Sequence, residues 1–331
     1  MKKFITIIAT AALAVGIFSA CGTQKNAATE QEKARLKIVT TIFPEYDWVN
    51  EILGDNKADV TLLLDNGVDL HSYQPTAEDI LKISECDMFI YVGGESDEWA
   101  EDALKEAKNK NMKVVNLLEA LGETVKEEEV KEGMQEEEHE HEENGEHKEH
   151  EEPEYDEHVW LSLKNTQTLV TKIADTLSQT DAKNAASYKS NANAYNQKLA
   201  RLDDEYRSAV NAASAKTLLF GDRFPFRYLV DDYGLDYYAA FAGCSAETEA
   251  SFETILFLAK KIDELGLKSI TQIESADGRI AETIKQNTAS KNQQILTLDS
   301  MQSTTSKDIS NGASYLTIMQ KNLAVLTEAL K

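Results

Sequence analysis

The stretch LKIVTTIFPEYDWVNEILG, residues 36–54, places two local patterns side by side. Residues 36–43 form a run rich in apolar and β-branched side chains, and Pro44 stops that run. From Tyr46 to Leu53 the apolar residues follow helical spacing, and Gly54 ends the pattern. The stretch therefore predicts a β-strand followed directly by an α-helix.

The same alternation recurs along the chain. Further strands are predicted at 58–64, 87–92, 113–117, 216–220, 237–241, 269–273 and 294–298, and further helices at 76–83, 98–107, 226–233, 252–265, 279–286 and 314–330. Strands that alternate with helices favour parallel sheets covered on both faces. We expect an α/β protein with two parallel-sheet lobes.

A long helix is predicted between the two sets of strands. Residues 154–220 contain neither glycine nor proline, which permits long helices. Apolar side chains recur there at spacings of three and four, at Ala185, Tyr188, Ala192, Tyr195, Leu199, Leu202, Tyr206 and Ala209. A helix over 183–212 would be roughly 45 Å long, enough to join a first lobe at 36–182 to a second at 213–331. Periodicity alone also allows a helix that belongs to one lobe.

The charge of the chain excludes several classes of protein. The 331 residues include 58 acids and 34 bases, for a net charge of −24. A nucleic-acid-binding protein needs a basic face, which this composition does not provide. Three cysteines in a chain of this length cannot form a disulfide scaffold.

Acidic residues concentrate in one segment, 126–157. It holds 17 acids and three lysines, together with His139, His141, His147 and His150. Such a tract buries too little apolar surface to offset its ordering entropy, so we expect a disordered insertion. Its histidines are predicted to assist metal capture, and the alternative is a solvated acidic linker whose histidines bind nothing.

The first residues have the features of an export signal. Lys2 and Lys3 precede an apolar run from Phe4 to Phe18, and small residues lead to Cys21. We expect a signal peptide at 1–20, lipid attachment at Cys21 and a tether at 21–35. This predicts an extracytoplasmic lipoprotein anchored to the cell membrane, and the alternative is an ordinary soluble signal peptide.

Only two histidines lie in sequence predicted to be ordered. His71 follows a predicted strand, so it lies at the carboxyl end of a sheet, where α/β proteins bind ligands. His158 precedes helical sequence in DEHVWLSL, residues 156–163. Taken singly, each is more often structural or exposed than a ligand.

Together these segments carry a resemblance to a known family. VTTIFPEYDWV at 39–49, GVDLHSYQPTAEDI at 67–80, DEHVWLSL and the histidine-rich acidic tract before His158 resemble the zinc/manganese-type substrate-binding lipoproteins of bacterial ABC transporters. The resemblance spans essentially the whole mature chain. It implies two α/β lobes joined by a rigid helix, one metal ion in the cleft between them and an ABC permease as partner.

The resemblance also implies a ligand set. His71 and His158 match the family's ligands in the first lobe, and Asp299 matches a carboxylate ligand in the second. The remaining position, a histidine or glutamate in the family, is Arg223 here, and a guanidinium has no free lone pair. Asp222, Glu274 or water remain as replacements, with Asp222 favoured and Glu274 also suited to support other ligands. Arg223 is then expected to hold Asp299 or Glu274.

Two imidazoles with carboxylates suit a borderline divalent ion. Such a set accepts Zn(II) or, with more oxygen ligands, Mn(II), and the histidine-rich tract favours zinc. Cys86 and Cys244 are interpreted as buried thiols, with Cys244 a further candidate as a soft ligand because it lies near a strand end.

We therefore predict a monomeric zinc-binding protein that delivers its ion to an ABC permease, and not an enzyme. The alternatives are manganese as the ion, a metal-buffering surface adhesin, and a metal-dependent hydrolase whose open coordination position activates water.

Overall fold

The framework of the protein is a pair of parallel β-sheets. The computed structural model describes residues 35–135, 154–245 and 249–331, and Arg35–Lys331 forms one compact unit. The first sheet has the order β2-β1-β3-β4, formed by β1 (Lys37–Thr40), β2 (Asp59–Leu62), β3 (Met88–Tyr91) and β4 (Lys113–Asn116). The second has the order β6-β5-β7-β8, formed by β5 (Thr217–Arg223), β6 (Asp236–Phe241), β7 (Ser269–Ile273) and β8 (Gln294–Leu298). All pairings are parallel, as predicted, and the two sheets share one topology.

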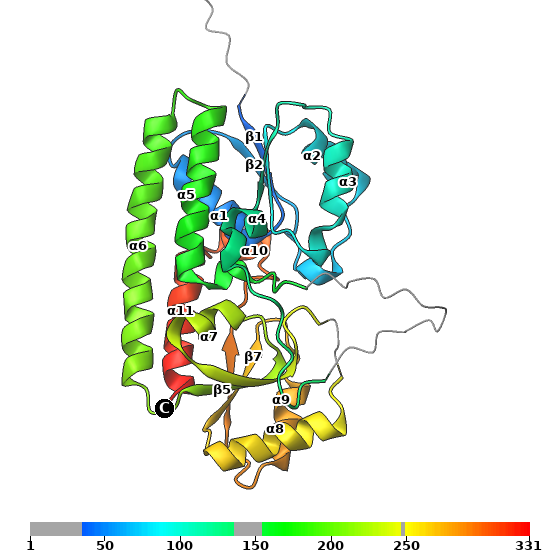
Figure 1. Cartoon of the computed structure of the whole chain (residues 1–331), viewed down its shortest axis with the longest axis vertical. Helices are drawn as coiled ribbons and strands as arrows, with labels where there is room; N and C mark the ends of the chain where they lie inside the picture. Colours follow the sequence, from blue (N-terminus) through cyan, green and yellow to red (C-terminus); the bar gives the residue numbers. More distant parts are fainter. Residues whose placement is uncertain (1–34, 136–153, 246–248) are drawn as a thin grey trace, which may run out of the picture. The chain divides into compact units, whose positions relative to one another are not determined.

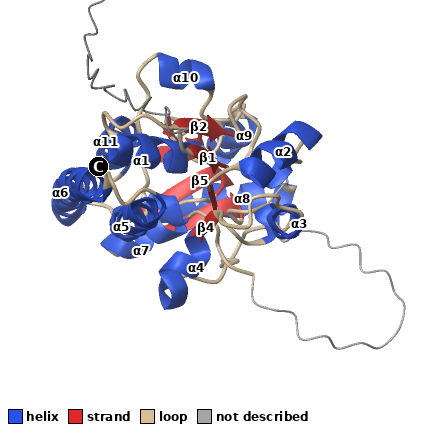
Figure 2. Ribbon diagram, turned by 90° about the horizontal axis from the view of Figure 1, so that it is seen from above, coloured by secondary structure: helices blue, strands red, loops and turns tan. Residues whose placement is uncertain are grey.

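Helices lie on both sides of the strands (Figures 1 and 2). They are α1 (Phe43–Leu53), α2 (Ala77–Glu85), α3 (Trp99–Lys105), α4 (Leu117–Leu121), α5 (Leu163–Thr180), α6 (Ala185–Ala212), α7 (Arg227–Tyr233), α8 (Phe252–Leu265), α9 (Arg279–Asn287), α10 (Ser306–Ser310) and α11 (Tyr315–Ala329). α1 begins three residues before its predicted start, because Pro44 occupies the first turn instead of only ending the strand. No helix in the described ranges is long and apolar enough to cross a membrane.

The long helix α6 connects the two halves. It lies beside α5 in an α-hairpin (Figure 1) and also contacts α1, α7 and α11. The predicted apolar stripe is buried from Tyr188 to Tyr206, and at its end Val210 is buried in place of Ala209. Because α1 belongs to the first half and α7 and α11 to the second, α6 packs against both.

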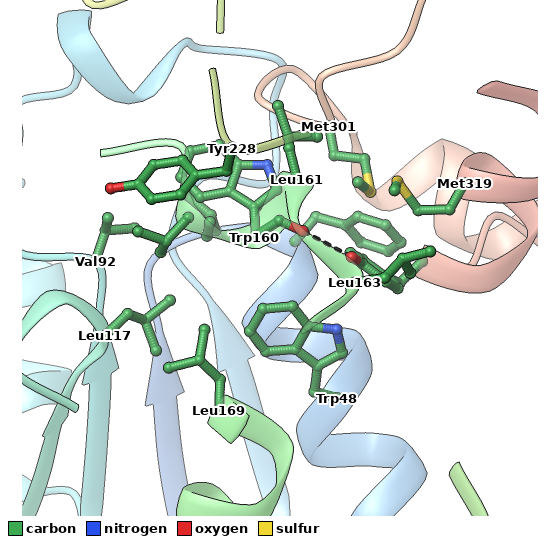
Figure 3. Close-up of a cluster of buried hydrophobic side chains, with 14 of the residues drawn as sticks. Trp48, Val92, Leu117, Trp160, Leu161, Leu163, Leu169, Tyr228, Met301 and Met319 are labelled. Atoms are coloured by element: carbon green, nitrogen blue, oxygen red, sulfur yellow. Dashed lines mark hydrogen bonds between the residues drawn. The ribbon is translucent and has the colours of Figure 1, made fainter. Parts of the chain in front are cut away.

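The hydrophobic core is shared between the halves. One cluster contains Trp48 of α1, Trp160, Tyr228 of α7 and Met319 of α11, and Figure 3 shows these side chains. Trp160 also donates its indole N–H to the Ser300 carbonyl at 2.8 Å and accepts a hydrogen bond from the Tyr315 hydroxyl at 2.6 Å. The two sheets therefore share a core at their junction, and a smaller cluster lies between the second sheet and the helices α8 and α9.

The segment predicted to be a disordered insertion, 126–157, is described at both ends. Glu127 forms a bridge with Tyr155, and the Gln135 amide donates to the Ala240 carbonyl at 2.9 Å. Disorder is therefore the wrong prediction for 126–135 and 154–157, because these ends find backbone partners, including one on β6. The middle of the tract, 136–153, lies outside the described residues.

Candidate metal centre

His71 lies in a short 3₁₀ turn, Leu70–Ser72, that follows β2. The Asp69 side chain caps this turn by accepting the His71 amide at 3.1 Å. At the ring, Nδ1 lies 2.7 Å from Oγ of Ser96. With Nδ1–H donating to that hydroxyl, the Nε2 lone pair is free to bind an ion.

His158 comes immediately before a second 3₁₀ turn, Val159–Leu161, and its side chain is fully buried. Asp156 accepts two hydrogen bonds through one oxygen, from the His158 amide at 2.9 Å and from Nδ1 at 3.0 Å. This fixes the ring and leaves Nε2 as the ligand atom. Trp160, two residues on, is bonded to the second half of the chain, so His158 lies at the junction of the two halves.

The two imidazoles face each other through their Nε2 atoms, which lie 3.2 Å apart. Two nitrogen ligands of a tetrahedral zinc ion, each at 2.0–2.1 Å, are separated by about 3.3 Å. The pair is therefore arranged as two ligands of one ion would be.

The pKa values of the two rings differ in direction. Burial, followed by the neighbouring His158, lowers the pKa of His71 to about 3. For His158 burial opposes the charged form, but Asp156 beside Nδ1 outweighs it and the pKa is raised. Because His71 is neutral, its contact with Glu157, 3.6 Å from Nδ1 to Oε2, is not an ion pair.

A thiol completes the group of ligand atoms. Among the described residues, one set of at least three histidine, cysteine or acidic side chains has its ligand atoms within 4.8 Å of one another: His71, His158 and Cys244. Cys244 lies in the loop after β6. From sequence it is interpreted first as a buried thiol and only second as a soft metal ligand. The sequence signal for this role is its position just after a predicted strand.

An acidic cavity of about 210 Å³ opens at this group. Four glutamates line it together with His71 and Cys244, and these are Glu95, Glu128, Glu154 and Glu157. Oε1 of Glu157 accepts the Ser96 amide at 2.9 Å, whereas its buried Oε2 has no hydrogen-bond partner. The cavity therefore offers negative charge and oxygen atoms to a cation at the imidazole pair.

The carboxylates predicted as ligands stand outside the group of three. Both oxygens of Asp222 accept backbone amides, from Arg223 at 2.8 Å and Ile273 at 3.2 Å. Glu274 accepts the Ser300 amide at 2.7 Å. Asp299 has a pKa raised to about 6 by burial and by the charge of Glu274. Asp299 and Glu274 follow β8 and β7, so they do lie at carboxyl ends of strands, as predicted.

Arg223, which stands at the family's ligand position, has a different partner from the one expected. Its guanidinium pairs with Asp69, and a second nitrogen lies 3.5 Å from the Ser245 carbonyl. The prediction that it holds Asp299 or Glu274 is wrong, because Asp69 reaches it from the first half. Arg223 thus connects the His71 turn to the loop that carries Cys244. It also lines a second cavity beside His71, of about 420 Å³.

Several supporting residues were missed by sequence reasoning. Ser96, Asp156 and Glu157 hold or face the imidazoles, and only Asp156 and Glu157 had a visible signal, because they directly precede His158. The other predicted residues, Cys21 and His139, His141, His147 and His150, lie outside the described residues.

Comparison with known proteins places the chain among zinc-uptake components. It is 31% identical over 300 residues to the zinc-binding protein AdcA of Streptococcus pyogenes, covering 89% of this chain and 56% of that one. It is also 31% identical over 315 residues to the high-affinity zinc uptake system protein ZnuA of Bacillus subtilis, covering 95% of this chain and 94% of that one. The chain therefore spans little more than half of AdcA and nearly all of ZnuA.

A solved structure is similar as well. The Zn(II)-bound ZnuA-like domain of Streptococcus pneumoniae AdcA superposes with a TM-score of 0.70 at 28% identity, covering 90% of this chain and 99% of that domain. The sequence model of the family described as "Zinc-uptake complex component A periplasmic" matches residues 38–329. Because this match covers almost all of residues 35–331, the chain belongs to this family of zinc-uptake components.

Proposed function

We propose that this protein captures Zn(II) at the His71–His158 pair, outside the cytoplasm, and delivers it to an ABC permease for import. The observation that carries the proposal is that the Nε2 atoms of His71 and His158 lie 3.2 Å apart. In each of the two rings, Nδ1 has an oxygen partner. Both rings are thus oriented for one ion before it arrives. Its relatives carry names of zinc-binding and zinc-uptake proteins, which supports a binding protein over an enzyme.

Zinc is proposed over manganese on chemical grounds. Imidazole nitrogens suit zinc, whereas manganese prefers a shell rich in oxygen. Asp299, Asp222 and Glu274 stay predictions as oxygen ligands. A role for any of them requires its carboxylate to move toward the Nε2 atoms.

The proposed setting follows from the first residues. Signal cleavage before Cys21 and lipidation of its thiol would hold a monomer at the outer face of the cell membrane, with residues 21–35 as a tether. Labelled fatty acid supplied to growing cells should enter the wild-type chain and not Cys21→Ala.

Calorimetric titration of the metal-free full chain, purified in detergent, tests the function. We expect one zinc ion per chain at the imidazole pair, bound more tightly than micromolar, and weaker binding of manganese. His71→Ala and His158→Ala should each abolish the tight site. Absence of binding tighter than micromolar by either ion would refute the proposal.

A metal buffer is the competing function, with the histidines of the acidic tract as its main sites. Deleting 136–153 and bridging the gap with a Gly-Ser linker separates the two, since the flanking backbone keeps its own partners, Glu128 with Glu154 and Gln135 with Ala240, each at 2.9 Å. We expect the tight zinc site and zinc-dependent growth to survive this deletion. A buffer would lose nearly all of its bound zinc.

A further inference from the structure

Cys244 is the third side chain whose ligand atom reaches the two imidazoles. Its Sγ and one ring nitrogen each from His71 and His158 lie within 4.8 Å of one another. Around a tetrahedral zinc ion, with Zn–S near 2.3 Å, sulfur and nitrogen ligands stand about 3.6 Å apart. The thiol therefore needs to approach by only about an ångström to join the two nitrogens on one ion.

The loop that carries Cys244 is held against the His158 ring. A Cβ added to Gly243 would meet the Phe224 carbonyl at 2.8 Å and the His158 ring at 3.2 Å, so the backbone passes too close for a larger residue. The Cys244 amide also donates to Oε1 of Glu128 at 2.9 Å. These contacts fix the start of the Cys244 side chain beside the imidazole pair.

The surroundings of Cys244 differ from those of an ordinary buried thiol. It is half-buried and lines the glutamate cavity together with His71. Cys86, in contrast, is fully buried in the first half, and its Sγ lies 3.3 Å from the Met112 sulfur. Cys86 therefore provides a matched thiol outside the His71–His158–Cys244 group.

We propose that Cys244 binds the captured ion as a thiolate, so that His71, His158 and Cys244 form a two-nitrogen, one-sulfur site that selects zinc against manganese. This rests on the proposed function, because it concerns the same ion. As the Zn–S bond forms, the S–H bond breaks and its proton passes to water in the cavity. The fourth position is left for water or a carboxylate. A soft thiolate favours Zn(II), whereas Mn(II) favours oxygen ligands.

The cysteine also accounts for the unusual residue at Arg223. The position that carries a ligand in the family holds a cation paired with Asp69, so it has no lone pair to offer. Arg223 is also 3.5 Å from the carbonyl of Ser245, the residue after Cys244. The arginine thus helps to hold the loop that supplies the replacement ligand.

Cobalt(II) substitution tests the assignment directly, because a Co–thiolate bond gives a charge-transfer absorption in the near ultraviolet. The full chain loaded with one equivalent of Co(II) should show this band, and Cys86→Ala should show it unchanged. Cys244→Ala and Cys244→Ser should lack it. In competition with a chromophoric chelator, their zinc dissociation constant should rise at least about 100-fold, while that of manganese changes little.

The outcomes separate this inference from the function. Tight zinc binding without the band, or zinc affinity unchanged in Cys244→Ala, would overturn the thiolate ligand and leave zinc capture intact. Failure of the wild-type chain to bind zinc would instead refute the function. Circular dichroism of each variant verifies folding. If Cys244→Ala misfolds, Cys244→Ser replaces it, because loss of the Co–thiolate band in that variant equally identifies Cys244 as the ligand.

Discussion

Asp156 is the residue on which the geometry of the metal centre depends most. One of its oxygens holds both the backbone and the ring of His158. It raises the electron density on Nε2 as well as fixing the tautomer. A carboxylate two residues before a buried histidine is thus part of the site although it does not touch the ion.

The corresponding prediction is for Asp156→Asn. The amide oxygen retains an acceptor but loses the charge, so zinc affinity should fall about 10- to 100-fold. Chelator competition measures this. Asp175→Asn, at an exposed carboxylate that pairs with Lys189 on the neighbouring helix, is the control and should bind as the wild type does. Equal affinities in all three proteins would contradict the role of Asp156.

Glu45 is a buried acid whose titration is expected to influence stability. Its Oε2 accepts the Thr41 amide at 2.8 Å, whereas its Oε1 is buried without a partner. Burial, followed by the charge of Asp97, raises its pKa to about 8. The folded protein therefore holds Glu45 protonated at neutral pH.

This pKa predicts a pH dependence of the free energy of unfolding. The folded-state pKa lies above the unfolded value of 4.5, so the stabilisation is complete below pH 4.5 and is lost as the pH rises toward 8. Glu45→Gln keeps an acceptor for Thr41 and cannot ionise. Urea denaturation at a series of pH values should show a smaller loss between pH 5 and 8 in this variant than in the wild type. If the free energy of unfolding depends on pH in the same way in both proteins, a group other than Glu45 is responsible for the loss of stability.

The helix α6 is attached to the second half by a buried hydroxyl. Tyr206 donates to the Met319 carbonyl of α11 at 2.6 Å and is fully buried. At the other end of the same helix, the hydroxyl of the buried Tyr188 donates at 3.1 Å to Asp181, which is partly exposed. The two tyrosines allow one helix to be probed at both ends.

Removing each hydroxyl should have unequal effects. Tyr206→Phe leaves a buried gap and removes a hydrogen bond, so unfolding should require about 1–1.5 kcal/mol less. Tyr188→Phe should lower stability by less, because water can replace the lost bond. Chemical denaturation of both variants measures the difference, and a larger loss in Tyr188→Phe would contradict this attachment of α6.

Sequence predicted most strands and the longer helices well. The bounds of β7, β8 and α8 match the predictions. The short helices α4 and α10 were missed, because five residues are too few for helical periodicity, and α4 begins where a strand was expected to end. Short helices depend on caps, such as Asn116 for α4, and on surrounding contacts.

The candidate site was predictable only where a residue type carried the signal by itself. His71 and His158 stood out because the four other histidines all lie in the acidic tract. Cys244 and the Arg223–Asp69 pair depend on distances between segments far apart in the chain, and one sequence does not contain those distances. A thiol is also more often simply buried than bound to metal, which lowered its rank.

The shared core makes the two sheets depend on each other. Trp48, Trp160 and Met319 belong to one cluster, and Trp160 is two residues from His158. We expect residues 35–331 to unfold in one calorimetric transition. Zinc at 100 times its dissociation constant should stabilise the whole of it by about 2.7 kcal/mol. Two transitions, of which zinc shifts only one, would show that the halves unfold independently.

The glutamate-lined cavity affects the rate of capture as well as its strength. Four carboxyl groups around an opening of about 210 Å³ focus their field outward, so a cation in dilute solution is drawn toward the imidazole pair. Such steering weakens as salt screens it, over about 10 Å at 0.1 M ionic strength. The association rate of zinc, measured by stopped flow, should therefore fall with ionic strength, and Glu95→Gln should flatten that slope while the dissociation rate changes little. The ionic strength of the surroundings would then set how fast the protein collects zinc.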